Sequence, residues 1–269
     1  IPDKPDTLQP AHPFVFSLAE AAAKVEARAA PSGPVRTLVV DRRGGTPYQT
    51  IAQAAKELRP GDTLALAPGS GPYREIMHVR VSGTAERPVA IEGNGETVTG
   101  LEPLAFKQVD GRWVAELGSL LSALPLVQGY KKKEGRWVQE SARPKTPIPL
   151  FPSVLVRNGR RLFQASATGQ FMDDALLSED GNTLTLKAGV EPTGFEIGVR
   201  DAAVRITDVS HQVYRNLKAP GCLNDGFNLH GRGSNLIFDK VEGSQNLDEG
   251  FSSHDGYECR VVDSKFREN

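Results

Sequence analysis

Long apolar runs and an excess of charge of either sign are missing from this sequence of 269 residues. No stretch approaches the roughly 20 apolar residues that a membrane span needs, so we expect no membrane partner. The 32 basic and 33 acidic residues nearly balance, which removes the general positive field that draws a protein to nucleic acid. The sequence also has no Gly-rich phosphate loop, dinucleotide fingerprint or Ser-His-Asp order.

Cysteine is scarce, with Cys222 and Cys259 as the only two. Two cysteines are too few for a disulfide framework or a structural zinc site. We therefore predict that both are free, buried thiols.

A repeat is the main feature that the sequence does have. Residues 224–230 (NDGFNLH) return 24 residues later as residues 248–254 (DEGFSSH), with acid, glycine, phenylalanine and histidine in register. A fixed period in the twenties, built from short apolar strands and Gly, Asn and Asp turns, is typical of a β-solenoid. We predict an all-β fold, a parallel β-helix with about 24 residues per coil.

The period places chemically interesting residues next to one another. Residues one coil apart lie on neighbouring parallel strands, about 4.8 Å from each other, so His254 is expected beside His230 and Glu249 beside Asp225. Side chains alternate between the two faces of a strand. If phenylalanine faces the core, the outward set is Asn228, His230, Asp248, Ser252 and His254. This outward cluster is the best candidate site in the sequence.

Four segments follow from the pattern along the chain. Residues 1–34 are a proline-rich extension with an Ala-rich helix over 17–30. Residues 35–100 hold the first coils and a capping helix over 46–58, with Thr46 as its N-cap and Gln49 completing a capping box. Residues 101–200 interrupt the solenoid and are predicted to form an inserted β-rich subdomain that can wall a substrate groove. Residues 201–269 return to coils, which we expect to continue beyond residue 269.

The first coils resemble a known group of enzymes. Residues 49–51 (QTI), 60–64 (PGDTL) and 82–85 (SGTA) resemble the start of right-handed parallel β-helix enzymes of the pectate-lyase-like superfamily. This group includes polysaccharide lyases, β-helix glycoside hydrolases and alginate C5-epimerases. The resemblance implies a right-handed β-helix and a polysaccharide bound along its outer face.

A second resemblance concerns chemistry. Residues 250–255 (GFSSHD) resemble a segment of the alginate C5-epimerases in which an aspartate and a histidine exchange a proton at the sugar C5. His254 and Asp255 match that segment, while Ser252 stands where the epimerases have the aspartate. The resemblance implies that His254 acts as a base. Because Ser252 replaces the aspartate, the resemblance does not extend to epimerase chemistry itself.

The acidic residues of the repeat allow several interpretations. Asp225, Asp248 and Glu249 can raise one another's pKa and so supply an acid and a base, as glycoside hydrolysis requires. The same oxygens can bind Ca²⁺. Alternatively, Asp and Asn beside Gly simply form turns. For substrate binding, the candidates are Asn228, Ser252 and, in a basic run of the insert, Lys132.

Two functions of different classes remain open. The first is a carbohydrate-active enzyme, a polysaccharide lyase or a glycoside hydrolase, whose catalytic candidates are His254, His230, Asp248, Asp255 and Glu249. The second is a non-catalytic β-helix module that binds glycan or serves as an adhesin. His230, His254 and Asp248 within hydrogen-bond reach of one another would favour the enzyme. We expect a secreted or periplasmic location, although the first residues show no signal peptide.

Overall fold

The computed structural model describes residues 33–122, 130–134, 136–139, 151–164, 170–171 and 174–269. The chain divides into two compact units, Ile1–Pro34 and Val35–Asn269. The helix predicted over residues 17–30 lies outside the described residues. Within the described part of the chain, no helix is long and apolar enough to cross a membrane.

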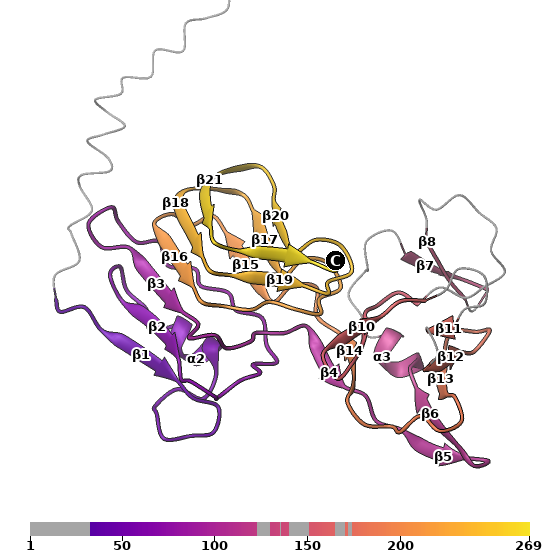
Figure 1. Cartoon of the computed structure of the whole chain (residues 1–269). Coiled ribbons are helices and arrows are strands. Elements are labelled where there is room, and N and C mark those ends of the chain that lie inside the picture. The colour runs from indigo at the N-terminus through magenta and orange to yellow at the C-terminus, as the bar shows by residue number, and fades with distance from the viewer. Residues whose placement is uncertain (1–32, 123–129, 135, 140–150, 165–169, 172–173) are drawn as a thin grey trace, which may run out of the picture. The chain divides into compact units, whose positions relative to one another are not determined.

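Stacked parallel strands form the main body of the second unit (Figure 1). One long sheet contains six strands in the order β1-β2-β3-β16-β18-β21, and every pair in it is parallel. These strands are β1 (Thr37–Val40), β2 (Thr63–Leu66), β3 (Val89–Glu92), β16 (Gln212–Arg215), β18 (Arg232–Asp239) and β21 (Gly256–Val262).

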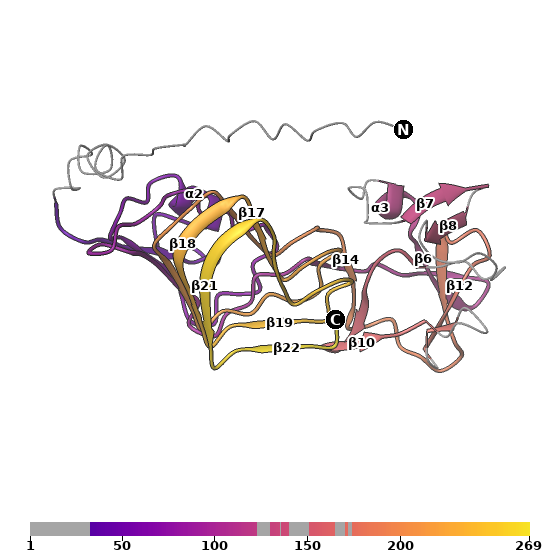
Figure 2. The ribbon, with the colours of Figure 1, turned by 90° about the horizontal axis from the view of Figure 1, so that it is seen from above.

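Two further faces complete each coil. One is the parallel sheet of β15 (Val204–Thr207), β17 (Phe227–His230) and β20 (Phe251–Ser253). The other contains β19 (Glu242–Ser244) and β22 (Lys265–Arg267), which Figure 2 shows side by side, and is continued by parallel bridges from Lys218 to Thr97 and to Glu242. The chain is a parallel β-helix.

Single residues with left-handed backbone turn the chain from the long sheet onto the β19 face. Asn94, Asn216, Lys240 and Asp263 have φ between 48° and 54°, and each follows a strand of the long sheet. Asn and Asp tolerate this region better than most residues. The short polar residues between apolar strands therefore have a backbone role, which keeps the coils in register.

Stacked side chains fill the interior of the coils. Tyr214 and Phe238, one coil apart, stack with their ring centroids 5.1 Å apart. Phe227 packs edge-on against Phe238 at 5.8 Å. Cys222 is buried and free, Cys259 is partly buried and free, and burial raises the pKa of the Cys222 thiol. The prediction of unpaired thiols is confirmed.

The capping helix is shorter than predicted. α2 spans Ile51–Ala55, and its N-cap is Thr50, not Thr46. Thr50 and Gln53 form the capping box, while the Thr46 hydroxyl donates to the Tyr48 carbonyl at 2.8 Å. Tyr48 also pairs with Val40 of β1, so the backbone at this point is extended and the helix starts later. Its buried residues Ile51 and Ala54 belong to the core of the coils.

The described residues between positions 101 and 198 form antiparallel sheets with a separate core. A four-stranded sheet has the order β10-β9-β14-β4, and a five-stranded sheet has the order β11-β12-β13-β6-β5. The first contains β4 (Leu101–Pro103), β9 (Leu155–Arg157), β10 (Arg160–Leu162) and β14 (Phe195–Gly198). The second contains β5 (Lys107–Val109), β6 (Arg112–Glu116), β11 (Gln170–Phe171), β12 (Ala175–Leu177) and β13 (Thr183–Leu186). The hairpin of β7 (Tyr130–Lys133) and β8 (Arg136–Gln139) and the helix α3 (Gly118–Ser122) complete the segment.

This segment, here called the insert, interrupts one coil without displacing it. β3 pairs directly with β16 on the other side of the insert, and the Asn216 side chain bonds Glu92, 124 residues earlier, at 2.9 Å. The chain leaves at Gly100, where a Cβ atom would lie 2.5 Å from the Gly221 carbonyl oxygen and 2.7 Å from the Cys222 Cα. Glycine is therefore required for the close approach of the two coils.

The insert is also held against the later coils. Arg161 donates to the backbone carbonyls of Asn246 at 2.5 Å and of Glu268 at 2.9 Å. The Gln245 side chain donates to the Gly159 carbonyl at 2.8 Å. These contacts fix one edge of the insert beside the face that carries β19 and β22.

Candidate functional site

Two rows of polar side chains run across the strands β15, β17 and β20. Parallel pairing aligns Arg205 with Asn228, and Asn228 with Ser252. It likewise aligns Thr207 with His230, whose ring stacks on that of His254. These two rows are called the histidine face below.

His254 is the centre of the histidine face. Its Nε2 atom lies 2.8 Å from the Ser252 hydroxyl oxygen, and its ring is nearly parallel to that of His230, with 4.6 Å between the centroids. The His230 Nδ1 atom lies 3.9 Å from a carboxyl oxygen of Asp255. Both imidazoles are exposed and Ser252 is buried, so a fixed hydroxyl orients a ring that is open to solvent.

Asp225 lies beneath this face. Its side chain is buried, with Oδ2 accepting from the side-chain amides of Asn224 at 2.9 Å and Asn228 at 2.5 Å, and Oδ1 accepting from the Glu249 backbone at 3.3 Å. Burial raises the pKa of the Asp225 carboxyl, against the effect of the Asn228 hydrogen bond, and the Asp248 and Glu249 charges raise it further. Asp225 therefore ties a loop to β17.

The histidine face extends to the coil of β2 through His78. The residue before it, Met77, bridges Val204 in parallel and accepts from the Arg205 backbone at 2.9 Å. Burial lowers the pKa of His78, and the charges of Arg80 and Arg205 lower it further. Its Nε2 atom is buried and has no hydrogen-bond partner among the residues that the structure describes.

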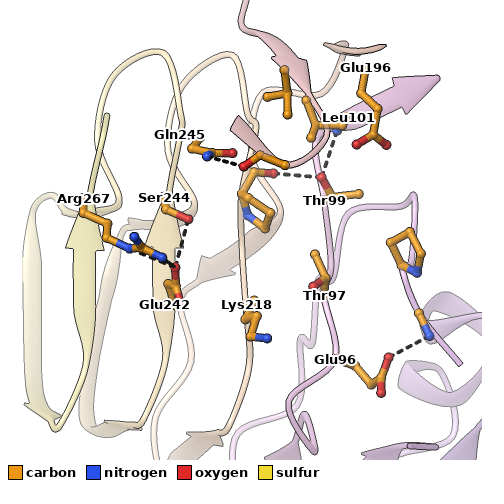
Figure 3. Close-up of a pocket in the computed structure, with 15 residues that line it drawn as sticks. Glu96, Thr97, Thr99, Leu101, Glu196, Lys218, Glu242, Ser244, Gln245 and Arg267 are labelled. Carbon is orange, nitrogen blue, oxygen red and sulfur yellow. Dashed lines mark hydrogen bonds and ion pairs between the residues drawn. The ribbon is translucent and has the colours of Figure 1, made fainter. Parts of the chain in front are cut away.

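A pocket lies on a different face of the coils (Figure 3). It has a volume of about 580 Å³, within the range of small-molecule sites, and it lies between the β19 face and the insert. The coils contribute Thr97, Lys218, Glu242, Ser244 and Arg267, and the insert contributes Val156, Gly159 and Glu196. We call this cavity the insert pocket.

The carboxylates of the insert pocket all have partners. Glu96 accepts from the backbone of Gly71 at 2.7 Å, Glu196 pairs with Arg74 at 2.6 Å, and Glu242 pairs with Arg267 at 2.9 Å. Glu196 and Glu242 are thus paired with arginines, whereas Glu96 is held by backbone amides and forms no ion pair among the described residues.

A second pocket adjoins the insert pocket. It is about 450 Å³ in volume, includes the turn residues Asn94, Asn216 and Lys240, and shares Lys218 and Glu242 with the insert pocket. We call it the turn pocket. Neither cavity includes a residue of the histidine face.

Comparisons with known proteins give similarity in fold only. No protein-family model matches the chain, and no curated protein sequence does. A solved structure of XylC with xylose has 16% identity and a TM-score of 0.49, with 79% of this chain and 41% of that chain covered. The GH136 lacto-N-biosidase of Eubacterium ramulus has 11% identity and a TM-score of 0.38, with 90% of this chain and 32% of that chain covered. Pectate lyase Pel9A has 13% identity and a TM-score of 0.37, with 87% of this chain and 48% of that chain covered. The chain spans less than half the length of each of these proteins, and similarities this weak assign no activity to it.

Some of the predicted site residues lie beside the two imidazoles and others do not. His254, His230, Ser252 and Asp255 lie together as described. Asp248 and Glu249 are exposed, and no hydrogen bond or ion pair within the described residues joins either side chain to the two imidazoles. Lys132 lies in β7, in a part of the chain whose side chains are not described.

Asn228 differs from its prediction. It was expected to point to solvent, but only 7% of its surface is exposed. The strand alternation is right, since Phe227 and Leu229 face the core. The Asn228 side-chain amide nevertheless donates to the buried Asp225 carboxyl. This hydrogen bond limits how far the Asn228 side chain can reach toward a ligand.

Calcium does not fit the predicted ligands as they lie. The Asp225 oxygens are already occupied by three donors. Across the described ranges, no three His, Cys, Asp or Glu residues are arranged to hold a metal ion. We derive no step through Ca²⁺.

Two residues of interest were missed by the sequence analysis. His78 and Lys218 both stand in register with residues from which the insert separates them by more than a hundred positions. Lys218 also lies 24 residues before Glu242, with which it pairs, so the repeat offered a signal for Lys218 but none for His78. The alternation of residues 77–81 (MHVRV), with apolar and basic residues in turn, was the available signal for His78.

Proposed function

We propose that the chain is a carbohydrate-active enzyme that acts on a polysaccharide bound along the histidine face, with His254 as its acid–base group. One observation carries the proposal: an exposed imidazole is fixed by a buried hydroxyl at 2.8 Å and stacked on a second imidazole at 4.6 Å. Histidine changes protonation near neutral pH and is the commonest general base in enzymes.

The regular spacing of the coils supports a polymeric substrate. Equivalent positions recur on each strand about 4.8 Å further along the stack. The row of Thr207, His230 and His254 thus offers accessible hydrogen-bonding groups at regular intervals, while Asn228 and Ser252 of the other row are buried. A chain of repeated sugar units matches such a surface better than a compact ligand does.

The composition of the cluster favours elimination over hydrolysis. Hydrolysis normally uses a facing pair of carboxyl groups, but Asp225 is buried and occupied. In elimination, His254 takes the proton from the carbon beside a uronate carboxylate. A carbon–carbon double bond forms, the glycosidic carbon–oxygen bond breaks, and the departing oxygen gains a proton from solvent or from His230.

A second candidate function is a binding module without catalysis. It is favoured by the position of the two pockets, which lie away from the histidine face, and by Asp248, whose side chain has no hydrogen bond or ion pair to His230 or His254 among the described residues. Fold alone does not decide between the two functions.

The test is an activity assay on wild type and His254→Ala. Reducing ends and absorbance at about 235 nm, the absorbance of a conjugated double bond, are followed over a panel of acidic and neutral polysaccharides, with Ca²⁺ and with chelator. We expect unsaturated ends from wild type and a loss of about 10²–10⁴-fold in rate for His254→Ala, the usual contribution of acid–base catalysis. Because His254 is exposed, its removal should leave the unfolding midpoint nearly unchanged.

His211→Asn is the matched control. His211 lies in a turn with φ of 55°, which asparagine tolerates, and it is outside the histidine face.

New reducing ends without the absorbance of a conjugated double bond would mean hydrolysis. Full activity in His254→Ala would refute the assignment of His254 as the acid–base group. Polysaccharide binding by wild type without any turnover would favour the non-catalytic binding module.

A further inference from the structure

Lys218 stands out among the charged residues of the insert pocket and the turn pocket. It lies between Thr97 and Glu242 on neighbouring coils (Figure 3). Glu242 is the nearest acid in this row, but its carboxylate accepts two bonds from Arg267, at 2.9 and 3.2 Å, on the far side. Among the described residues, the Lys218 ammonium has no hydrogen bond or ion pair.

The two neighbouring lysines are in the same situation. Lys240 lines the turn pocket beside Lys218, and Lys265 lies in register with Glu242. Throughout the described ranges, neither side chain takes part in an ion pair. Lys218 and Lys265 thus stand in register with Glu242 on the coils to either side, and Lys240 lies two residues before it, while Arg267 already pairs with that carboxylate.

The rest of the lining suits a sugar. Thr97 and the backbone of the turns offer hydroxyl and amide groups, while Pro72, Pro220, Leu101 and Val156 provide a small apolar floor. A ligand site of this kind combines a mainly apolar wall with a few placed polar groups. Polar groups at the rim bind hydroxyls, and the lysine supplies a point charge for an anion.

We propose that the insert pocket and the turn pocket together form a second glycan-binding site, the lysine groove, which takes an oligosaccharide carrying a carboxylate or sulfate group. Lys218 is its central anion-binding residue, because it alone of the three lysines lines both cavities. The groove is separate from the histidine face and does not depend on catalysis there.

The structure also argues for a saccharide over a bare anion. A small ion needs several donors converging on one point, whereas the lysines are spread along three coils. The combined cavity is long enough to border five coils, from Gly71 to Arg267. An extended ligand with spaced hydroxyls and one or more charges matches this shape.

Calorimetric titration tests the proposal on the full chain. The probes are a tetragalacturonate for the carboxylate, a carrageenan tetramer for the sulfate, and neutral galactotetraose. We expect wild type to bind at least one charged probe, and Lys218→Gln to weaken its Kd at least tenfold. Lys218→Arg, which keeps the charge, should recover part of the loss, and added salt should weaken wild-type binding.

Two controls separate this site from the histidine face. Lys56→Gln removes an exposed lysine outside both cavities and should bind like wild type. His254→Ala should also bind in the lysine groove, whatever its activity. Equal binding by wild type and Lys218→Gln, equal affinity for the neutral probe, or no binding to either charged probe would each overturn the proposal.

Discussion

His78 is a basic residue whose protonation the fold disfavours. Burial, Arg80 and Arg205 all lower its pKa, so the folded chain resists a proton that the unfolded chain accepts below about pH 6.5. The stability associated with neutral His78 is therefore complete above that pH. It is lost as the pH falls from about 6.5 toward the lowered pKa of the folded state.

His78→Gln should remove this pH dependence. We expect the free energy of unfolding of wild type to fall relative to the variant between pH 7 and pH 5, by at most about 1.4 kcal/mol per pH unit. Denaturant unfolding at each pH measures the difference. Parallel curves for the two proteins would show that His78 is protonated equally in the folded and unfolded states.

Sequence predicted the register of the candidate site better than its exposure. The 24-residue period aligns His254 with His230 because stacking depends only on coil length. The burial of Asn228 depends on a carboxyl three positions earlier that folds over it, and no period encodes that contact. The lack of an ion pair for Lys218 among the described residues likewise arises because Glu242 pairs with Arg267. That pairing is decided by side-chain geometry.

The strands are stabilised by their inward aromatic residues, and those residues are not equivalent. Phe238 is fully buried between Tyr214, Phe227 and Phe251. Phe251, one coil after Phe227, is only partly buried. The cavity left by a deleted ring scales with how completely neighbours enclose it.

Phe238→Ala should therefore cost about 3–5 kcal/mol in the free energy of unfolding, and Phe251→Ala clearly less. The exposed neighbour Ile237 provides the matched control, because Ile237→Ala should change stability by less than about 1 kcal/mol. Chemical denaturation of the three variants gives the comparison. An equal loss for both phenylalanines would mean that Phe251 is enclosed as fully as Phe238.

The capping helix shows why a local pattern is not unique. The segment 46–53 (TPYQTIAQ) contains two consecutive capping-box patterns, Thr46 with Gln49 and Thr50 with Gln53. The pairing of Tyr48 with Val40 of β1 removes the first choice. Tertiary pairing thus selects between two starts that sequence alone leaves equivalent.

At the scale of the whole molecule, the junction of the insert is a tight constraint. Gly100→Ala would place a methyl group against the backbone of Gly221 and Cys222, and backbone yields less than a side chain does. We expect a loss of roughly 1–3 kcal/mol, typical of overpacking. Thermal unfolding of the variant tests this.

Gly118→Ala is the control within the insert. The nearest atom to its added Cβ lies at 3.5 Å, an ordinary contact, and the residue begins the helix α3. This variant should be neutral or slightly stabilising. A Gly100→Ala protein as stable as Gly118→Ala would mean that the two coils separate easily at the junction.

The splice of the insert into one coil also has a consequence for biosynthesis. The edge of β3 finds its partner only when β16 emerges, and Glu92 and Asn216 are 124 residues apart. At 5–20 residues per second, the nascent chain carries a bare strand edge for roughly 6–25 s. Such an edge is a template for pairing with other chains, so the speed with which the insert is translated limits how long this protein is exposed to misassembly.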